Sequence, residues 1–430
     1  MNKLQNLIIK LLLTIKKKRI ELQIYYICKM FKKKPSQFEF IALMAALMSV
    51  VALAIDGLLP ALDIIGQSVG SESNSDNQLL IIMIFLGLGI GPLLFGPISD
   101  AIGRKPVVYV GFLVFVLASF LCIHAQSIEV MIIGRILQGI GLSAPRTISI
   151  AIVRDTFNGD YMARIMSFIT VMFLLVPTIA PALGKLVLVM YNWQAIFYFQ
   201  LIIVVLVSIW FWLRQPETLH SEYRVKFTKT LAIDGAKELF KYKQTIGYTL
   251  ISGFITGSFM VYLSTAQQIF QHQYNLEHEF PFIFAGLAIS MGAASLSNGS
   301  VVIKFGMKRL ATTALYTFFG VSLIYILLFF NSENPSIEIL LVFFALQFFS
   351  IGFLFGNLRA LAMQPIAHIA GIGAALTGFI STLMAVPIST LIGRYVETTA
   401  LPLFIGFCIC SFLSILITRY LKYDLNKSSR

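Results

Sequence analysis

The sequence lacks the charged residues with which a water-soluble protein covers its surface. Only 12% of its 430 residues are charged, and tryptophan occurs three times. Soluble domains carry about 25% charged residues. Hydrophobic residues make up 57% of the chain, and the mean hydropathy of +0.83 is too high for a surface that faces water. These deficits exclude an ordinary soluble domain and predict helices that are solvated by lipid.

Signatures of cofactors and of covalent chemistry are also missing. The four cysteines form no CxxC pair, and the five histidines form no HExxH motif. No glycine-rich loop ending in Lys-Ser or Lys-Thr is present, so the sequence offers no site for ATP. The hydrophobic segments hold no convergent nucleophile and base. We therefore expect neither a metal site nor a cofactor, and we do not expect an enzyme.

Twelve segments of the chain are long and apolar enough to cross a bilayer. Crossing about 30 Å of hydrocarbon takes about 20 helical residues, and most connections are short, as between antiparallel neighbours. The sequence predicts an all-α integral membrane protein with twelve transmembrane helices in two six-helix bundles. The predicted spans are residues 38–58, 78–98, 106–124, 128–152, 163–190, 194–213, 244–270, 280–303, 308–330, 336–358, 369–393 and 399–421.

One long polar connection, residues 214–243, divides the chain into two halves of six predicted spans. We predict a basic cytoplasmic tail over residues 1–37 and an N-terminal six-helix bundle over residues 38–213. After the cytoplasmic linker come a C-terminal six-helix bundle over residues 244–421 and a cytoplasmic tail over residues 422–430.

A weak internal repeat supports this division. Gly96 and Gly103 lie seven residues apart between the second and third predicted spans, just before a basic pair. Gly299 and Gly306 lie seven residues apart between the eighth and ninth spans, with basic residues again following. Corresponding features in corresponding spans indicate two parallel repeats, as in many secondary transporters.

Lysine and arginine gather on one side of the predicted topology. The tail 1–37 carries ten and the linker 214–243 carries seven, whereas the loops 59–77 and 271–279 carry none. Because basic residues near span ends stay in the cytoplasm, we predict that both termini are cytoplasmic, in the inner membrane of a bacterial cell. This distribution explains the net charge of +13 without nucleic acid as a partner. We expect the tail on the anionic inner leaflet, unless translation begins at Met30.

The sharpest motif lies at a predicted cytoplasmic turn and reads Gly96-Pro-Ile-Ser-Asp100-Ala-Ile-Gly103-Arg104-Lys105. Asp100 ends a helix where Arg104 can reach it, so this charged cluster can hold one conformation shut and release it in another. A basic stop-transfer turn is the simpler alternative. The motif resembles the signature loop of the major facilitator superfamily.

Further stretches are similar to one branch of that superfamily, the bicyclomycin-resistance and chloramphenicol-resistance type of drug:proton antiporter. They include residues 54–62, 135–141 and 177–184. The resemblance implies a twelve-helix fold whose central cavity alternates access between the two sides of the membrane. It also implies that Arg154 and Asp155, which close span four, act in conformational gating together with the signature loop.

The antiporter motif of span five is represented by Pro177, Pro181 and Gly184. The resemblance implies that this stretch packs against the eighth span and keeps the carrier from leaking. Ordinary enrichment of glycine and proline in membrane helices is the alternative. Lys185 departs from the family pattern, which usually has a small residue at this place.

Two ionisable residues are predicted inside the spans of the first half. Asp56 is the candidate proton carrier, because a charged carboxylate inside a membrane is costly, and competition between substrate and proton for one carboxylate would couple their movements. Capping of the outer end of span one is the alternative. The resemblance implies that Arg135 faces the cavity or the first helix and tunes the proton affinity of the acid. A buried structural arginine bonded to carbonyls is the other interpretation.

Helical periodicity places Arg135, Gln138, Leu142 and Arg146 on one face of span four. Together with Asp56, these residues form the predicted substrate cavity. Arg146 either snorkels to the cytoplasmic side or faces the cavity. In the cavity, two cations on one stripe would suit an anionic or zwitterionic substrate.

Other polar residues within or beside the spans carry weaker expectations. Asp63 is expected in a solvated loop. In the second half, Gln267, Gln268, Asn298, Asn357 and Gln364 either line the cavity or form interhelical hydrogen bonds.

These observations predict proton-coupled efflux of small, partly apolar compounds by alternating access. The expected partners are the lipid bilayer, a small-molecule substrate and protons, and we expect a monomer. A transporter of one metabolite, such as an amino acid or a siderophore, is the close alternative. A transport-dead receptor with the same fold is a further one.

Overall fold

The computed structural model describes residues 35–428, apart from residues 72, 158, 220, 221, 223, 225–230 and 332. Within this part of the chain every regular element is a helix. The predicted basic tail lies almost wholly outside the described residues, and so does the expectation of a start at Met30. Part of the predicted linker also lies outside them.

The first half of the chain forms six long helices and two short ones. Its elements are α2 (Gln37–Asp56), η1 (Leu59–Ala61), α3 (Leu62–Ser68), α4 (Asn74–Ile102), α5 (Arg104–Ile123), α6 (Ile128–Thr156), α7 (Gly159–Met190) and α8 (Trp193–Arg214).

The second half begins after a short helix in the linker, α9 (Leu231–Phe240). Its elements are α10 (Lys243–Gln267), η3 (Gln268–Gln273), α11 (Phe280–Phe305), α12 (Met307–Phe329), α13 (Ile337–Met363), η4 (Gln364–Ile369), α14 (Ala370–Gly393) and α15 (Leu401–Ser428).

The long helices confirm the predicted membrane fold. In the described part of the chain, eleven helices are long and apolar enough to cross a membrane. The twelfth long helix is α7, with 32 residues, in which the stretch Ile179–Met190 forms a shorter apolar segment. Each predicted span coincides with one of these helices. The last helix, α15, continues to Ser428, into the segment expected as a tail.

Polar side chains mark where several spans begin. The Ser36 hydroxyl accepts a hydrogen bond of 3.2 Å from the Glu39 backbone nitrogen at the start of α2. The Asn192 side chain accepts one of 2.9 Å from the Ala195 nitrogen at the start of α8. Because the first turn of a helix leaves backbone N–H groups without partners, such caps fix the ends of spans that are apolar along most of their length.

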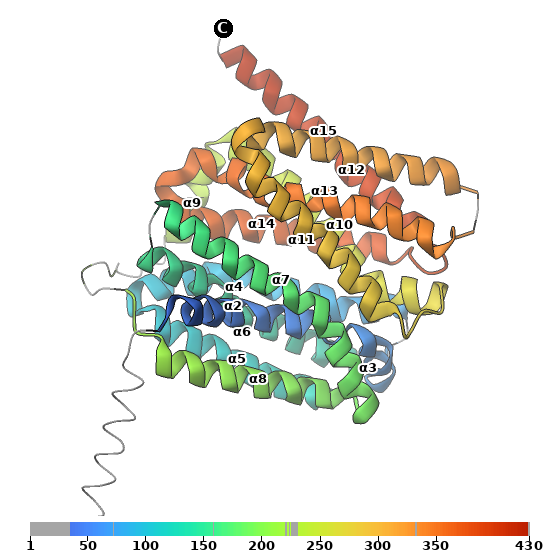
Figure 1. The fold of residues 1–430 in the computed structure, drawn as a ribbon, viewed down its shortest axis with the longest axis horizontal. Coiled ribbons are helices and arrows are strands. Elements are labelled where there is room, and N and C mark those ends of the chain that lie inside the picture. The colour runs from blue at the N-terminus through green and yellow to red at the C-terminus, as the bar shows by residue number, and fades with distance from the viewer. Residues whose placement is uncertain are drawn as a thin grey trace, which may run out of the picture.

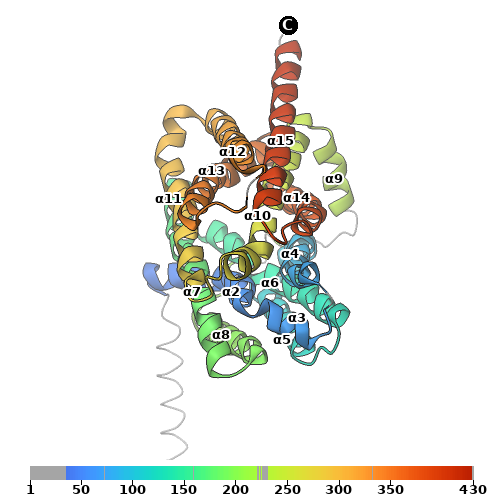
Figure 2. The ribbon, with the colours of Figure 1, turned by 90° about the vertical axis from the view of Figure 1, so that its right-hand side faces the viewer.

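The helices assemble into two groups that lie one above the other in Figures 1 and 2. The group α2 to α8 is coloured blue to green, and the group α10 to α15 yellow to red. Across the boundary between them, α4 packs against α14 and α7 packs against α11. Since α11 is the eighth span, the second contact is the one that the resemblance implied for span five.

Two short helices were not predicted from the sequence. Helix α3 continues the first span after the break at η1. In the linker, α9 lies against α14 (Figure 2), and its Leu239 packs in a hydrophobic cluster with Ile366 and Leu376. The linker is therefore partly folded onto the second half.

The internal repeat is visible in backbone geometry. Gly103, between α4 and α5, has a φ of 114°, and Gly306, between α11 and α12, has a φ of 77°. Both angles lie in the region that favours glycine. The two glycines thus make equivalent sharp junctions in the two halves.

A second equivalence lies inside the bundles. Nε2 of Gln138 in α6 donates to the Ser119 hydroxyl in α5 at 2.8 Å. Nε2 of Gln347 in α13 donates to the Ser322 hydroxyl in α12 at 2.7 Å. The fourth and tenth spans are therefore counterparts, each tied to the preceding span by a buried glutamine.

Candidate functional site

Arg104 is the centre of an ion cluster at one end of the first half, called here the Arg104 end. It is 3% exposed. Its Nε donates to Asp155 Oδ2 at 2.8 Å, and its Nη1 donates to the Ser99 hydroxyl at 2.8 Å and to the Asp100 carboxylate. The predicted gating residues Asp100, Arg104 and Asp155 are thus brought together, and they tie α4, α5 and α6 to one another.

Glu217, in the linker after α8, belongs to the same cluster and was missed in the sequence. Its carboxylate accepts the backbone N–H groups of Arg104 at 2.9 Å and Lys105 at 3.0 Å, the first two residues of α5. It also accepts those of Thr218 and Leu219, both at 3.0 Å. An anion at a helix N-terminus is stabilised by these donors and by the helix dipole. The available signal was an acid directly after a span in a basic linker.

The surroundings of Glu217 act on its pKa in opposite directions. Partial burial tends to raise the pKa, but the hydrogen bonds from the Leu219, Arg104, Lys105 and Thr218 backbone outweigh it and lower the pKa below its usual value. The linker carboxylate is therefore held as an anion against α5.

The other predicted gating residues take different places. Nζ of Lys105 donates to the carbonyl oxygens of Trp212 at 3.2 Å and Gln215 at 2.6 Å, which ties α5 to the end of α8. Arg154 is exposed, and within the described part of the chain no contact joins it to the Arg104 cluster. A Cβ added to Gly96 would have no neighbour within 4 Å, so no close approach of another helix requires glycine at this position.

Asp56 is the last residue of α2 and is 5% exposed. Among the described residues it has no hydrogen-bond or ion-pair partner. Tyr262 of α10 lies close enough for its hydroxyl to interact electrostatically with the Asp56 carboxylate. The Tyr262 hydroxyl is buried and also lacks a hydrogen-bond partner there. The acid therefore lies within electrostatic range of the second half of the molecule.

Arg135 is fully buried and holds α6 against two other helices. Its Nε donates to the Leu80 carbonyl of α4 at 2.8 Å, and its Nη2 donates to the Ala54 carbonyl of α2 at 3.1 Å. Its Nη1 donates to Gln138 Oε1 at 2.7 Å. Arg135 thus bonds the backbone two residues before Asp56 and forms no ion pair with that acid. The contacts are those of an arginine that is bonded to carbonyls.

On the face of α6 that carries Arg135, the exposure of the side chains changes along the helix. Arg135, Gln138 and Leu142 are each 0% exposed, whereas Arg146 on the same face is exposed. Arg146 is the only exposed residue from 138 to 153. Asp155 lies in the last turn of α6. The exposed residue of this face is therefore the one nearest the Arg104 end, and the three residues farther from that end are buried.

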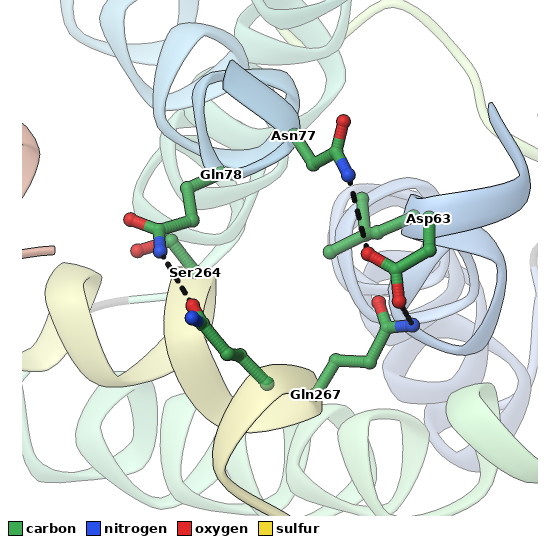
Figure 3. Close-up of a pocket in the computed structure, with 7 residues that line it drawn as sticks. Asp63, Asn77, Gln78, Ser264 and Gln267 are labelled. Atoms are coloured by element: carbon green, nitrogen blue, oxygen red, sulfur yellow. Dashed lines mark hydrogen bonds between the residues drawn. The ribbon is translucent and has the colours of Figure 1, made fainter. Parts of the chain in front are cut away.

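At the opposite end of the first half, called here the Asp63 end, polar side chains of the two halves bond to one another. This cluster, the Asp63 lock, consists of Asp63, Asn77, Gln78, Gln267, Gln268 and His272. The sequence expectation for Asp63 is wrong, because Asp63 lies in α3 and is bonded rather than solvated. Its carboxylate accepts from Gln267 Nε2 at 2.9 Å and from Asn77 Nδ2 at 3.2 Å, and His272 Nε2 lies 2.6 Å away. Figure 3 shows Asp63 between Asn77 and Gln267 at the edge of a small polar pocket.

Gln78 completes the Asp63 lock from α4. Its Nε2 donates to Gln268 Oε1 at 2.9 Å and to the Gly393 carbonyl at 3.2 Å. Lys185, the departure from the family pattern, donates from α7 to the Glu277 carbonyl. These side-chain hydrogen bonds join the two halves at the Asp63 end.

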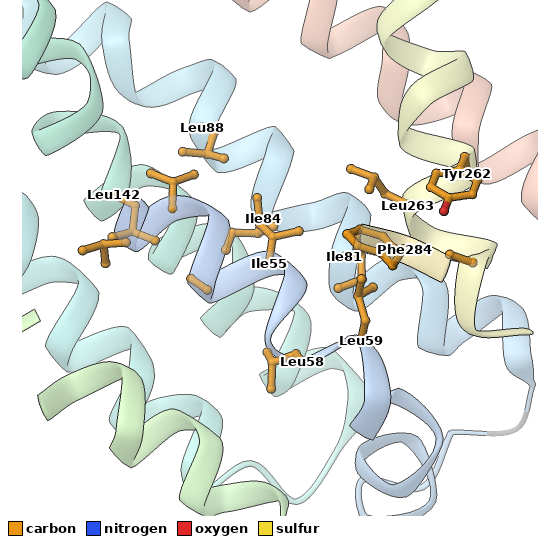
Figure 4. Packing of buried hydrophobic residues seen from close by; sticks show 14 of the residues in the cluster. Ile55, Leu58, Leu59, Ile81, Ile84, Leu88, Leu142, Tyr262, Leu263 and Phe284 are labelled. Atoms are coloured by element: carbon orange, nitrogen blue, oxygen red, sulfur yellow. The ribbon is translucent and has the colours of Figure 1, made fainter. Parts of the chain in front are cut away.

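Farther inward from the Asp63 lock, apolar side chains join the two halves. Ile81 of α4 and Leu59 of η1 share one hydrophobic cluster with Leu263 of α10 and Phe284 of α11. Figure 4 shows these side chains meeting between the two groups of helices. Water is thereby excluded from the boundary between the halves on the side of the Asp63 end.

The polar residues of the second half favour one of the two sequence interpretations. Gln267 and Gln268 belong to the Asp63 lock. Asn357 Nδ2 donates to Asn298 Oδ1 at 2.7 Å, between α13 and α11. All four amides therefore make interhelical hydrogen bonds.

The antiporter motif touches the first span. A Cβ added to Gly184 of α7 would collide with the carbonyl group of Gly57, the residue after α2. Pro181 is buried, and the Pro177 side chain lies outside what the structure describes. Only glycine at position 184 permits this close approach of span five to the residue next to Asp56.

Comparisons with known proteins agree with this geometry. The family model described as Major Facilitator Superfamily matches residues 43–386. The "Uncharacterized MFS-type transporter YdgK" of Bacillus subtilis (strain 168) is 31% identical over 82% of this chain and 87% of its own length. A "Bicyclomycin resistance protein homolog" of Haemophilus influenzae is 25% identical over 90% and 97%.

Solved structures show the same fold. A D-xylose-proton symporter superposes with a TM-score of 0.66 at 14% identity, covering 88% of this chain and 97% of the symporter. This likeness concerns the arrangement of the helices alone.

Proposed function

The chain belongs to the major facilitator superfamily, and from that membership we propose that it is a proton-coupled antiporter that exports small, partly apolar compounds. Family membership makes the protein a multi-pass membrane transporter rather than an enzyme. The relative named for bicyclomycin resistance supports the drug-like class of substrate.

The observation that carries the proposal is that the two ends of the molecule differ in how the halves contact each other. The Asp63 end is bonded across the halves through Gln78 and Gln267, while Arg146 is exposed on the side of the Arg104 end. A carrier that alternates access needs one end closed while the other admits substrate. Opening the lock and closing the Arg104 end gives the opposite state.

Asp56 is the proposed proton site. It is buried at the boundary between the halves beside Tyr262, and no cation neutralises it among the described residues. Inside a membrane protein, an unpaired carboxylate is more stable when it carries a proton. A change in its surroundings as the halves rock would release that proton, and so couple proton entry to substrate exit.

The proposed orientation follows the basic residues. With the linker and both termini in the cytoplasm of a bacterial cell, the Arg104 end faces the cytoplasm and the Asp63 end faces outward. Substrate would then enter from the cytoplasm in the state described. We propose that the working unit in the inner membrane is a monomer.

The test is transport by purified protein in proteoliposomes under an imposed pH gradient. The parent is expected to move a lipophilic drug panel against its gradient, and Asp56→Asn is expected to abolish this movement. Asp76→Asn, which removes an acid from the first turn of α4, is the matched control and should retain transport. Unchanged gradient-driven transport by Asp56→Asn would refute the assignment of the proton site.

A further inference from the structure

The counterpart helix of α6 in the other half, α13, also carries an arginine near its end at the Arg104 side. Arg146 follows Gln138 by eight residues in α6, and Arg359 follows Gln347 by twelve residues in α13. Since these glutamines are equivalent between the repeats, the two arginines differ by one helical turn and project from matching faces. The positive charge of Arg359 acts on Arg146 across the boundary between the halves.

The surroundings of this pair are unusual for two cations. Both residues are exposed, yet both guanidinium groups lose hydration to the protein around them. They therefore lie in an enclosed position that solvent reaches. Within the described part of the chain neither arginine has a hydrogen bond or an ion pair, whereas Arg104 and Arg214 are each bonded to a carboxylate.

Asp56 is not positioned to neutralise the pair. Arg146 lies eleven residues beyond Arg135 on α6, which corresponds to about 16 Å along the helix axis. Arg135 bonds the carbonyl of Ala54, so Asp56 lies near that distant level. Two like charges at close range repel each other in a medium of low dielectric constant. A negative charge from outside the protein would remove this repulsion.

Apolar groups lie beside Arg359 on the same side of α13. Phe355 precedes Arg359 by one turn and meets Phe259 of α10 edge to face, with ring centroids 5.6 Å apart. Both rings are partly exposed. The position therefore offers aromatic surface next to the Arg359 guanidinium group.

We propose that Arg146 and Arg359 together bind the anionic group of the substrate, so that the protein exports amphiphilic organic anions whose apolar part packs on Phe355 and Phe259. This inference rests on the proposed efflux function and narrows its substrate class. A planar guanidinium binds a carboxylate, sulfonate or phosphate oxyanion through paired N–H donors. Because one arginine comes from each half, an anion between them also draws the halves together at the Arg104 end, which is the movement that alternating access needs.

The test uses three naphthalene compounds of similar size and different charge in proteoliposomes with an imposed pH gradient. They are 2-naphthalenesulfonate, its neutral sulfonamide and (2-naphthyl)trimethylammonium. The variants are Arg146→Gln and Arg359→Gln, singly and together. Arg394→Gln removes an exposed arginine at the Asp63 end and is the matched control.

We expect the parent to transport the sulfonate, and each single variant to lower that rate about tenfold or more, because hydrogen bonds between a guanidinium and an anion are among the strongest in proteins. Arg394→Gln should match the parent. Transport of the sulfonamide or the ammonium compound, but not of the sulfonate, would leave the efflux function standing and overturn the inference. An equal loss for all compounds in the arginine variants would also overturn it.

Binding in detergent separates the inference from the efflux function. The sulfonate should raise the melting temperature of the parent more than the same concentration of sodium sulfate, and the double variant should lose this shift. If the parent transports none of the three compounds but shows the shift, the efflux function fails and the anion site stands. A shift no larger than that of sulfate means an adventitious ion only, and the inference is then wrong.

Discussion

Nε2 of His272 in the second half lies 2.6 Å from Oδ2 of Asp63 in the first half. This contact places the two halves in register at one end of the molecule, where Gln267 bonds the same carboxylate and Gln78 bonds Gln268. The cluster connects residues about two hundred positions apart in sequence. At the other end of the first half, Arg146 is exposed.

Weakening the Asp63 lock should open the Asp63 end. In the double variant Gln78→Leu, Gln267→Leu, the loss of hydrogen bonds worth about 0.5–1.5 kcal/mol each should move the population toward the state that is open at the Asp63 end. Double electron–electron resonance between spin labels at Ile64 and Tyr395, both exposed near this end, in a cysteine-free background should show a larger fraction of long distances.

Asn298→Leu is the control for this measurement, because the Asn298–Asn357 hydrogen bond lies wholly within the second half. Its distance distribution should match that of the parent. An unaltered distribution in the double variant would mean that the polar contacts do not hold the end closed.

The ion cluster at the Arg104 end distinguishes two adjacent residues that the sequence grouped together. Asp155 bonds the buried Arg104 side chain, whereas Arg154 is exposed. Asp155→Asn removes one of the two carboxylates that bond Arg104. Since a hydrogen bond to a charged group contributes about 1.5–3 kcal/mol, Asp155→Asn should lower the initial transport rate about tenfold, and Arg154→Gln should keep it within about twofold. Equal losses in the two variants, at equal amounts of folded reconstituted protein, would contradict this assignment.

The linker carboxylate gives a pH-dependent contribution to stability. The folded state holds the pKa of Glu217 below its usual value of 4.5, so its stabilisation is complete above that value and is lost as the pH falls through the lower, folded-state pKa. Because Glu217 is exposed and screened by solvent, Glu217→Gln should cost about 0.3–1 kcal/mol at neutral pH. In thermal melting, the difference from the parent should vanish in acid.

Glu333→Gln serves as the control, because Glu333 is an exposed loop residue and has no side-chain partner among the described residues. It should melt like the parent at every pH. A Glu217→Gln difference that persists unchanged however far the pH falls below the usual carboxyl pKa of 4.5 would show that the carboxylate charge is not its source.

The two junction glycines should respond differently to alanine. Both have positive φ, so each substitution costs about 1–2 kcal/mol of backbone strain. A Cβ at position 103 would also lie 2.8 Å from Glu217 Oε2, whereas one at 306 would meet nothing within 4 Å. Gly103→Ala should therefore lower the melting temperature more than Gly306→Ala, and only the former should remove the pH-dependent contribution of Glu217. Equal melting temperatures would refute this reading of the junction.

Local sequence was sufficient for the membrane helices because a span must be long and apolar wherever it lies in the bundle. Residues 280–303, for example, were predicted almost as α11 forms. The Asp100–Arg104 pair was also predictable, since four residues separate its members on the chain. The repeat of Gly103 and Gly306 was readable because both junctions need the same backbone conformation.

Contacts between distant segments were not readable in this way. The sequence suggested that Asp56 and Arg135 act as a pair, but Arg135 is bonded to carbonyl groups. The Asp56 carboxylate instead lies within electrostatic range of Tyr262 in the other half. Asp63 resembled a loop acid because nothing in its neighbourhood reveals the amide of Gln267.

The sequence by itself determined the lipid-solvated helices, their number and the twofold repeat, because hydrophobic length and glycine backbone freedom are properties of short segments. Only the tertiary structure decided which polar groups meet across the halves, such as Asp63 with Gln267 and Gln78 with Gln268. The physical reason is that hydrogen bonds and charges act over a few ångströms, and the packing of helices from opposite halves sets those distances.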